Sequence, residues 1–433
     1  MSSPPSFDWQ RGIGRDEAGK VLEAALSRGQ IGNRSALVFH DLEALARRIH
    51  HLRQCFPPQT VHALAIKANP LVALLRYAVE CGMGLEAASI EEVALARAAG
   101  CPPDSIVYDS PAKTRAEIDL ALSAGILLNA DSFRELERID EAIGSGASTR
   151  SLIGLRINPQ IGMGTIGMLS VSGRYSKFGV PLGERRSGII DAFSRHRWLR
   201  ALHLHIGSQG VTQEQLANAV RSVFELREEI HAALGESRIE SVDIGGGLPW
   251  RYREHESVPT PDSYAAALKE TVPQAFSPSV RLITEFGRAV QTGCGFAASR
   301  VEYLKQECGR RTAVIHFGAD LMMRRVYRPA DWNHRLSVLA PDATPKRSPE
   351  EPHTIAGPLC FAGVLLAEDI HLPRIEEGDW IVIHDIGGYT LGLWSRHCNR
   401  GLPLVLGYST NPWRFRVLLA GETPEDVVRF WGG

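Results

Sequence analysis

The sequence lacks the features that would assign a chain of 433 residues to several common classes. Its seven cysteines are odd in number and scattered, with no CxxC pair, which argues against a disulfide framework and a zinc site. The formal net charge is −1 without basic runs, so charge gives no reason to expect nucleic acid or an anionic membrane as partner. No segment is apolar enough to span a bilayer, and the N-terminus has no apolar core of the signal-peptide type. We therefore expect a cytoplasmic protein.

The sequence does contain a regular alternation of short apolar segments and longer stretches with helical periodicity, from residue 61 to 290. The predicted strands cover residues 61–68, 84–89, 105–110, 126–131, 151–159, 199–208, 241–247 and 281–286. Eight strand–helix units over about 230 residues predict an α/β fold, a closed (β/α)8 TIM barrel rather than an open doubly wound sheet.

The pattern changes after residue 290, where apolar segments broken by Pro and Gly predict a second, β-rich domain. The segment SALVFH within the first 40 residues could supply that domain with a strand. The predicted division is an N-terminal segment 1–40 that partly joins the β domain, a barrel over 41–292, and a C-terminal β-rich domain over 293–433.

Polar side chains gather at the predicted carboxyl ends of the strands, where barrels of this class carry their chemistry. Each could be a solvated loop residue, but together they converge on one mouth. The set is Lys67, Glu86, Asp109, Asp131, Arg156, Asn158, His205, Ser208, the run Gly245-Gly246-Gly247, Glu285 and Arg288. Lysine is among the least buried residues, so its place at the end of the apolar run VHALAIKA calls for a functional reason.

Two glycine loops follow the seventh and eighth predicted strands, where such barrels often hold a phosphate. Successive glycines in DIGGGLP allow backbone N–H groups to line up toward an anion, and TEFGR adds Gly287 and the cation Arg288. A glycine triplet alone often marks only a tight turn, but the second loop and its arginine strengthen the phosphate interpretation.

A lysine, a phosphate cradle, an acid and a histidine in one mouth fit pyridoxal 5′-phosphate (PLP). Lys67 would form a Schiff base with the aldehyde, since a largely apolar pocket favours its neutral, nucleophilic form. Glu285 would face the pyridine nitrogen and keep it protonated, which makes the ring an electron sink. His205 would lie flat against the ring, and His203 is predicted to be a hydrogen-bonded core residue.

Motifs along nearly the whole chain resemble the fold-type III PLP-dependent decarboxylases, the group of diaminopimelate, ornithine and arginine decarboxylases. They include AIKANP (65–70), LRINP, SKFG (176–179), HLHIGSQ (203–209), DIGGGLP (243–249), EFGR (285–288), GPLC (357–360) and GGY (387–389). The resemblance implies the barrel-plus-β-domain fold shared by alanine racemase and ornithine decarboxylase. It also implies a head-to-tail homodimer with shared active sites and an amino acid as substrate.

The resemblance also implies residue roles. Lys67 matches the Schiff-base lysine, His205 the ring-stacking histidine and Glu285 the pyridinium partner. Cys360 matches a cysteine that reaches in from the partner subunit and helps protonate the product. The implied phosphate ligands and further cofactor contacts are Ser208, Gly245, Gly246, Gly247, Gly287, Arg288, Tyr389, Glu86 and Arg156.

Departures from the family pattern concern the substrate. After Cys360 the run is CFAGVLLAED, so Phe361 and Val364 stand where two acidic residues usually help to hold a distal polar group. This argues against plain ornithine, lysine or diaminopimelate and suggests secondary metabolism. In FGADLMMRRVY, Tyr327 fits a substrate contact, and either Arg324 or Arg325 could bind a distal carboxylate.

The leading hypothesis is therefore a lyase that removes the α-carboxylate of an amino acid, with Lys67, Cys360 and His205 as catalytic residues. Arg324, Tyr327 and Phe361 would contact the substrate, and no metal is expected. A racemase is the second hypothesis, but such enzymes usually place an arginine on the pyridine nitrogen, and Glu285 speaks against it. The third is a PLP-binding homologue that has lost activity, motivated by Phe361 and Val364.

Overall fold

A computed structural model describes residues 7–146, 149–162 and 164–433, which form two compact units. The barrel unit takes in the described residues of Ala46–Trp250 and Ser257–Ala289 together with Phe7, Asp8 and Trp9. The sheet unit takes in Gln10–Leu45, Arg251–Glu256 and Val290–Gly433. Among the described residues, no helix combines the length and the apolar character needed to cross a membrane.

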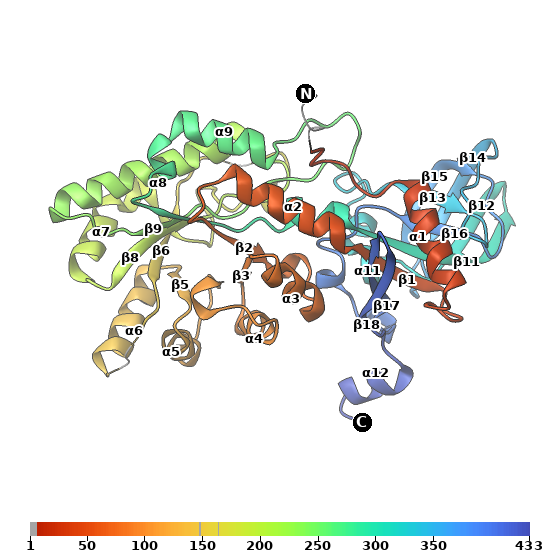
Figure 1. The fold of residues 1–433 in the computed structure, drawn as a ribbon, viewed down its shortest axis with the longest axis horizontal. Coiled ribbons are helices and arrows are strands. Elements are labelled where there is room, and N and C mark those ends of the chain that lie inside the picture. The colour runs from red at the N-terminus through yellow and green to blue at the C-terminus, as the bar shows by residue number, and fades with distance from the viewer. Residues whose placement is uncertain (1–6, 147–148, 163) are drawn as a thin grey trace. The chain divides into compact units, whose positions relative to one another are not determined.

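The barrel unit contains a closed ring of eight parallel strands, which confirms the predicted fold class. Figure 1 shows the strands of this unit between its helices. The ring closes because β5 pairs with β6 and β2 pairs with β10. The short strand β7 (Val180–Pro181) pairs with β6 outside this ring. In chain order the ring strands are β2 (Val61–Ala65), β3 (Gly84–Ala87), β4 (Ile106–Tyr108), β5 (Leu127–Ala130), β6 (Ile153–Asn158), β8 (Leu199–Leu204), β9 (Ser241–Asp243) and β10 (Arg281–Thr284).

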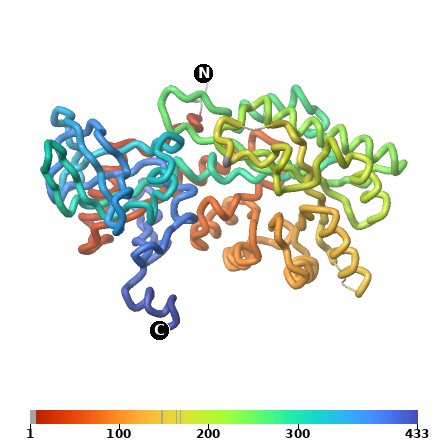
Figure 2. The backbone as a smooth tube through the Cα atoms, turned by 180° about the vertical axis from the view of Figure 1, so that it is seen from behind, coloured from red at the N-terminus to blue at the C-terminus, as the bar shows by residue number. Residues whose placement is uncertain are grey.

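Helices flank these strands, with α3 to α6 on one side and α7 to α9 on the other; Figure 2 shows the same helices from behind. Local sequence sets several of their ends. Thr114 and Glu117 form a capping box at the start of α5, and Gly125, with φ +71°, ends it. The helices of this unit are α2 (Leu42–Cys55), which begins in the sheet unit, α3 (Val72–Glu80), α4 (Ile90–Ala98), α5 (Arg115–Ala124), α6 (Phe133–Gly144), α7 (Leu182–Arg195), α8 (Gln213–Leu234), α9 (Pro261–Thr271) and α10 (Arg288–Gln291), which ends in the sheet unit.

The sheet unit is built on a nine-stranded, mostly antiparallel sheet. Strand β1 from the SALVFH segment pairs with β11 and β17, so the N-terminal part of the chain contributes a strand to this sheet. The strands are β1 (Ala36–Asp41), β11 (Gly295–Glu307), β12 (Arg310–Ile315), β13 (Leu336–Leu339), β14 (Glu350–Ala356), β15 (Leu365–Pro373), β16 (Trp380–Ile383), β17 (Leu404–Thr410) and β18 (Trp413–Leu419). The helices are α1 (Arg15–Ser27), α11 (Ala319–Tyr327) and α12 (Pro424–Phe430).

Each barrel strand is shorter than its apolar run predicted, and the difference falls mainly at the carboxyl end. The run VHALAIKA ends as a strand at Ala65 and continues as a 3-10 turn over Ile66–Ala68. Similarly, β8 ends at Leu204 and β9 at Asp243, where glycine and polar residues begin. Most residues predicted to carry the chemistry therefore lie in the turns just beyond the strands, whereas Glu86, Arg156 and Asn158 lie within the last residues of β3 and β6.

Candidate active site

Strand register brings the predicted mouth residues together. Ala65 pairs with Glu86, so Lys67, two residues further along the chain, lies beyond the strand end next to that carboxylate. On the opposite side of the barrel, one register row joins Arg156, His203 and Asp243 on three neighbouring strands. Parallel strands end at the same edge, so these side chains share one mouth.

Lys67 is held by a carboxylate. Its Nζ lies 2.7 Å from both Oε1 and Oε2 of Glu86, which is fully buried, while the lysine side chain is 39% exposed. Burial raises the pKa of Glu86 well above its usual value, an effect that the charge of Lys67 only partly offsets. The surroundings of Lys67 are thus acidic and not the largely apolar pocket that the sequence suggested.

Glu285 lies in a cluster of buried carboxyl groups at the end of β10. Burial, followed by the negative charges of Asp243, Asp109 and Glu86, raises its pKa well above its usual value. Its Oε1 is buried without a hydrogen-bond partner among the described residues, although Nε2 of His203 lies 3.4 Å away. This carboxyl group is therefore suited to a cationic or N–H-bearing partner that the protein itself does not supply.

The two histidines of HLHIGS differ in their contacts. His205 accepts a hydrogen bond at Nδ1 from the Gly246 amide at 3.0 Å, and burial lowers its pKa to about 3, so its ring is neutral. His203 is fully buried, as predicted, but its ring nitrogens have no hydrogen-bond partner among the described residues. The predicted hydrogen-bonded role of His203 is therefore wrong, and the histidine instead lies among carboxylates.

The glycine loop after β9 is tightly packed. A Cβ on Gly245 would lie 2.3 Å from the Leu204 carbonyl oxygen, and one on Gly246 would lie 2.7 Å from the Glu285 carbonyl oxygen. The amides of Gly245 and Gly246 donate to Asp243 and His205, so these two N–H groups are engaged within the protein. Of the three glycine amides predicted to face an anion, only that of Gly247 has no hydrogen bond to described residues.

An anion-binding set forms from the neighbouring loops. The Ser208 hydroxyl oxygen accepts hydrogen bonds from Nε and Nη2 of Arg288, both at 3.2 Å. Gly287 is buried in the turn between β10 and α10, directly before this arginine. Arg288, the Ser208 hydroxyl and the nearby glycine loop provide a positive charge and donors at the phosphate position expected in this barrel.

Arg156 lies deep in the mouth with carboxylates on two sides. Its Nη1 is 3.9 Å from Asp109 and 3.8 Å from Asp131, and its guanidinium lies over the Phe178 ring at 4.5 Å from the centroid. The charges of Lys67, His203 and Arg156 outweigh burial and hold the pKa of Asp109 below its usual value. Arg156 therefore balances the acidic residues of the mouth, and its predicted contact with the cofactor stays a prediction.

These residues fit PLP on three independent observations. Lys67 presents a primary amine at the mouth. Oε1 of Glu285, which has no hydrogen-bond partner among the described residues, can accept a hydrogen bond from a protonated ring nitrogen. Arg288 and Ser208 can bind a phosphate. The close packing of the glycine loop leaves no room for side chains beside His205. The predicted roles of Lys67, Glu285, Arg288 and Ser208 are thus compatible with the geometry.

The sheet unit carries the remaining predicted residues. The Phe361 ring stacks on that of Tyr327, with centroids 6.1 Å apart, and the Arg324 guanidinium lies over the rings of Trp332 and Tyr389. Cys360 is exposed. Arg325 is instead buried, and its Nε and Nη1 donate to the carbonyl oxygens of residues 366 and 334. Arg325 is therefore a structural residue, and the suggestion that it binds substrate is wrong.

Sequence reasoning gave no role to Asp243 or to the carboxylate contacts of His203. Asp243 accepts from the Gly245 amide at 2.9 Å and from Nδ2 of Asn129 at 3.4 Å, and burial raises its pKa to about 7. The available signal was its place directly before the glycine run, at the end of a strand. Only the register, which places Asp243 beside His203, shows that it belongs to the mouth.

Comparison with known proteins agrees with this geometry. Residues 42–292, more than half of the chain, match the family described as pyridoxal-dependent decarboxylase, pyridoxal binding domain. The diaminopimelate decarboxylase of Archaeoglobus fulgidus is 31% identical over 372 residues, which cover 84% of this chain and 83% of that protein. The Helicobacter pylori enzyme is 27% identical over 409 residues, 92% and 95% of the two chains.

Solved structures agree on the fold. The diaminopimelate decarboxylase of Helicobacter pylori in complex with L-lysine superposes with a TM-score of 0.82 at 25% identity, covering 94% of this chain and 98% of that one. A lysine/ornithine decarboxylase from Vibrio vulnificus, in complex with putrescine, has a TM-score of 0.71 at 20% identity and covers 87% and 94%. The second likeness concerns the fold alone.

Proposed function

Since this chain belongs to the fold-type III pyridoxal-dependent decarboxylases, we propose that it removes the α-carboxylate of an amino acid other than plain ornithine, lysine or diaminopimelate. The family members are carboxy-lyases that use PLP. The observation that carries the assignment of the site is the pair of 2.7 Å contacts between Lys67 Nζ and the buried Glu86, at the mouth that also holds Glu285.

The chain's own residues provide binding and proton handling. Ser208 and Arg288 would bind the phosphate of PLP, and Glu285 would accept a hydrogen bond from the ring N–H. The neutral His205 would lie against the ring. PLP supplies an electron-withdrawing ring for the carbanion left by decarboxylation. Glu86, whose pKa burial raises, has both carboxylate oxygens 2.7 Å from Lys67 Nζ and is placed to accept a proton from this amine.

The charge of Glu285 would also keep a proton on the nitrogen that it binds. A cationic N–H close to Oε1 would lower the raised pKa of Glu285 and favour its ionised form. The proton would then remain on the partner nitrogen. An arginine at that position would instead leave the ring nitrogen without a proton and weaken the ring as an electron acceptor. Glu285 therefore favours decarboxylation over racemisation.

The proposed substrate follows from the loop after Cys360. Val364 is 2% exposed and packs with Ala319 and Leu359, while Phe361 packs against this cluster and stacks on Tyr327. An acidic side chain at position 364 would be buried without a counter-charge, so packing itself favours an apolar residue there. The loop therefore offers a distal cation no carboxylate from either position, and we propose a substrate whose distal end is bulky or acidic, with Arg324 as the group that attracts an acid.

A substrate panel tests the function. Purified holoenzyme is incubated with L- and D-amino acids, including ornithine, lysine, diaminopimelate and acidic or aromatic derivatives, and CO2 and amine are quantified. We expect turnover of a bulky or acidic substrate and loss of it in Lys67→Ala, while Lys305→Ala, at an exposed lysine of the sheet unit, retains it. Efficient turnover of diaminopimelate would overturn the proposed substrate choice. Racemised substrate without CO2, or no reaction on the whole panel, would favour the racemase or the inactive homologue.

We also propose a homodimer whose sites combine Lys67 of one subunit with Cys360 of the other. The test mixes two inactive variants, Lys67→Ala and Cys360→Ala, under conditions that exchange subunits. Half of the resulting dimers would contain one intact site, so we expect activity to return to about a quarter of the parent value. Activity that stays at the level of the separate variants would contradict shared sites.

A further inference from the structure

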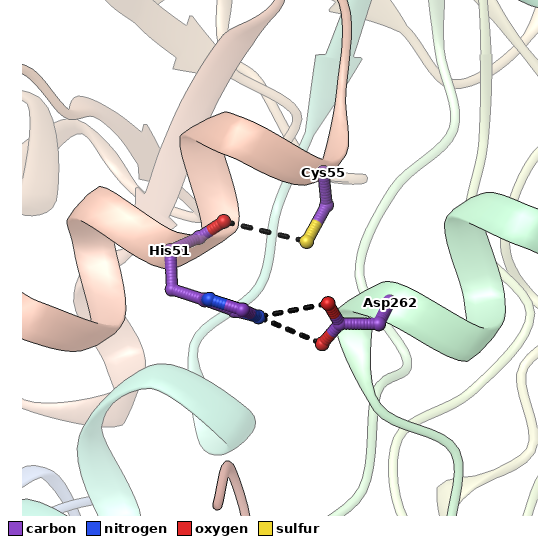
Figure 3. Close-up of side chains that lie close together, drawn as sticks. All are labelled: His51, Cys55 and Asp262. Atoms are coloured by element: carbon purple, nitrogen blue, oxygen red, sulfur yellow. Dashed lines mark hydrogen bonds and ion pairs between the residues drawn. The ribbon is translucent and has the colours of Figure 1, made fainter. Parts of the chain in front are cut away.

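A second group of chemically active side chains lies in the barrel unit, on helices α2 and α9 and not on the strands or turns that carry the mouth residues. His51 and Cys55 are four residues apart and so share one face of α2, and Asp262 lies in the first turn of α9 (Figure 3). Their imidazole nitrogen, thiol sulfur and carboxylate oxygen all lie within 4.8 Å of one another. No role in the decarboxylase site uses these three side chains.

The contacts of His51 hold its ring in place. Nε2 lies 2.9 Å from Oδ1 and 2.8 Å from Oδ2 of Asp262. The ring stacks on Phe7, with centroids 4.8 Å apart, and also contacts the Trp9 ring. The aromatic contacts therefore fix the imidazole plane and leave Nε2 directed toward Asp262, as Figure 3 shows.

Cys55 completes the group from the next turn of the helix. Its Sγ donates to the His51 carbonyl oxygen at 3.3 Å, a weak bond that a ligand can replace. Burial, followed by the charge of Asp262, raises the pKa of this thiol to about 12, so the metal-free protein keeps it protonated. A metal ion would take the place of that proton, which passes to the buffer.

We propose that His51, Cys55 and Asp262 bind a divalent transition-metal ion of the zinc class. One imidazole nitrogen, one thiolate and one carboxylate form a donor set that Zn²⁺ accepts in tetrahedral geometry, with water in the fourth position. Metal–ligand bonds of about 2.0 Å at tetrahedral angles place N and O ligands about 3.3 Å apart. His51 and Asp262 must therefore separate by about 0.5 Å, which the Asp262 side chain, 56% exposed, has room to do.

The consequence of binding follows from topology. Helix α2 precedes β2, and α9 precedes β10 apart from the 3-10 turn Pro273–Phe276. The strands β2 and β10 pair in the barrel, and they lead to Lys67 and Glu285. A metal ion would join the two helices beside this strand pair. The bound form should thus resist unfolding better than the metal-free form.

Cobalt substitution tests the site. Holoenzyme treated with a chelator and dialysed is titrated with Co²⁺, whose thiolate charge-transfer and d–d bands report a tetrahedral site with a sulfur ligand. Difference spectra against the untitrated holoenzyme remove the contribution of the cofactor. We expect saturation at one equivalent per chain and displacement by Zn²⁺. The matched control is Cys81→Ser, which removes another half-buried cysteine of the same unit.

The variants decide the outcome. We expect Cys55→Ser and His51→Gln to lose the bands and Asp262→Asn to weaken Co²⁺ binding at least tenfold, while Cys81→Ser matches the parent. Zn²⁺ should raise the melting temperature of the parent and of Cys81→Ser but not of Cys55→Ser. A parent without thiolate bands, or bands that persist in Cys55→Ser, would overturn the proposal and leave a His–Asp ion pair beside a cysteine.

Discussion

Replacement of the Glu285 carboxyl group by an amide should stabilise the cofactor-free protein at pH 7 and lower the activity of the holoenzyme. Glu285 is fully buried beside Asp243, Asp109 and Glu86, and its pKa lies well above its usual value because of burial and these neighbouring charges. The folded protein therefore releases the proton of this carboxyl group at a higher pH than the unfolded chain does. Stability must fall as pH rises from the unfolded pKa toward the folded one.

The size of the effect follows from proton linkage. Each pH unit in that window costs about 1.4 kcal/mol of unfolding free energy for one such group, so the parent should lose up to about 3 kcal/mol at Glu285 between pH 5 and 7. Glu285→Gln removes this loss, because glutamine does not titrate. The cofactor-free variant should therefore be as stable as the parent at pH 5 and more stable at pH 7.

Urea unfolding of cofactor-free protein at both pH values measures this difference. Glu285→Asp is the control, since it keeps an ionisable group among the same carboxylates and should retain the pH dependence. In the holoenzyme we expect Glu285→Gln to lower kcat about 100-fold or more, because a neutral amide does not stabilise positive charge on the ring. A variant that is less stable than the parent at pH 7, or an unchanged pH dependence, would refute this reasoning.

Three further substitutions test other parts of the account. Gly245→Ala should destabilise the barrel unit by about 2 kcal/mol or more and weaken PLP binding, since φ is +66° and the new Cβ would meet the Leu204 carbonyl oxygen; thermal melting and cofactor titration measure both. Phe361→Glu should raise kcat/KM for diaminopimelate at least tenfold by supplying a carboxylate for its distal amine, and unchanged kinetics would contradict the proposed loop role. Lys113→Met should cost about 3–5 kcal/mol, because it leaves the buried Glu135 without its partner at 2.7 Å; a smaller shift in the urea midpoint would show that this pair is dispensable.

Much of the barrel mouth could be predicted because the alternation of apolar segments with helical stretches indicates where each strand ends. Alternating apolar segments located all eight strands, and the predicted mouth residues lie in the last residues of these strands or in the segments that follow them. Lys67 was found in this way from a single apolar run. The environment of Lys67 could not be predicted, because Glu86 meets it only through the register of β2 and β3.

Other features depend on contacts between segments far apart in the sequence. Asp243 and His203 lie on adjacent strands 40 residues apart along the chain, and neither motif indicates that the two residues are paired. Arg325 and Arg324 are neighbours in sequence, yet helix geometry buries the first and places the second over two aromatic rings. Scattered cysteines argued against a zinc site, but a single cysteine can join a histidine one helical turn away and an aspartate from another helix.

The lysine that carries the cofactor can be identified by chemical trapping of its bond to PLP. Holoenzyme is reduced with borohydride, digested and mapped by mass spectrometry. We predict that the pyridoxyl group is found on Lys67 and that Lys67→Ala carries none. A label on another lysine, or a reduced protein without any label, would contradict it.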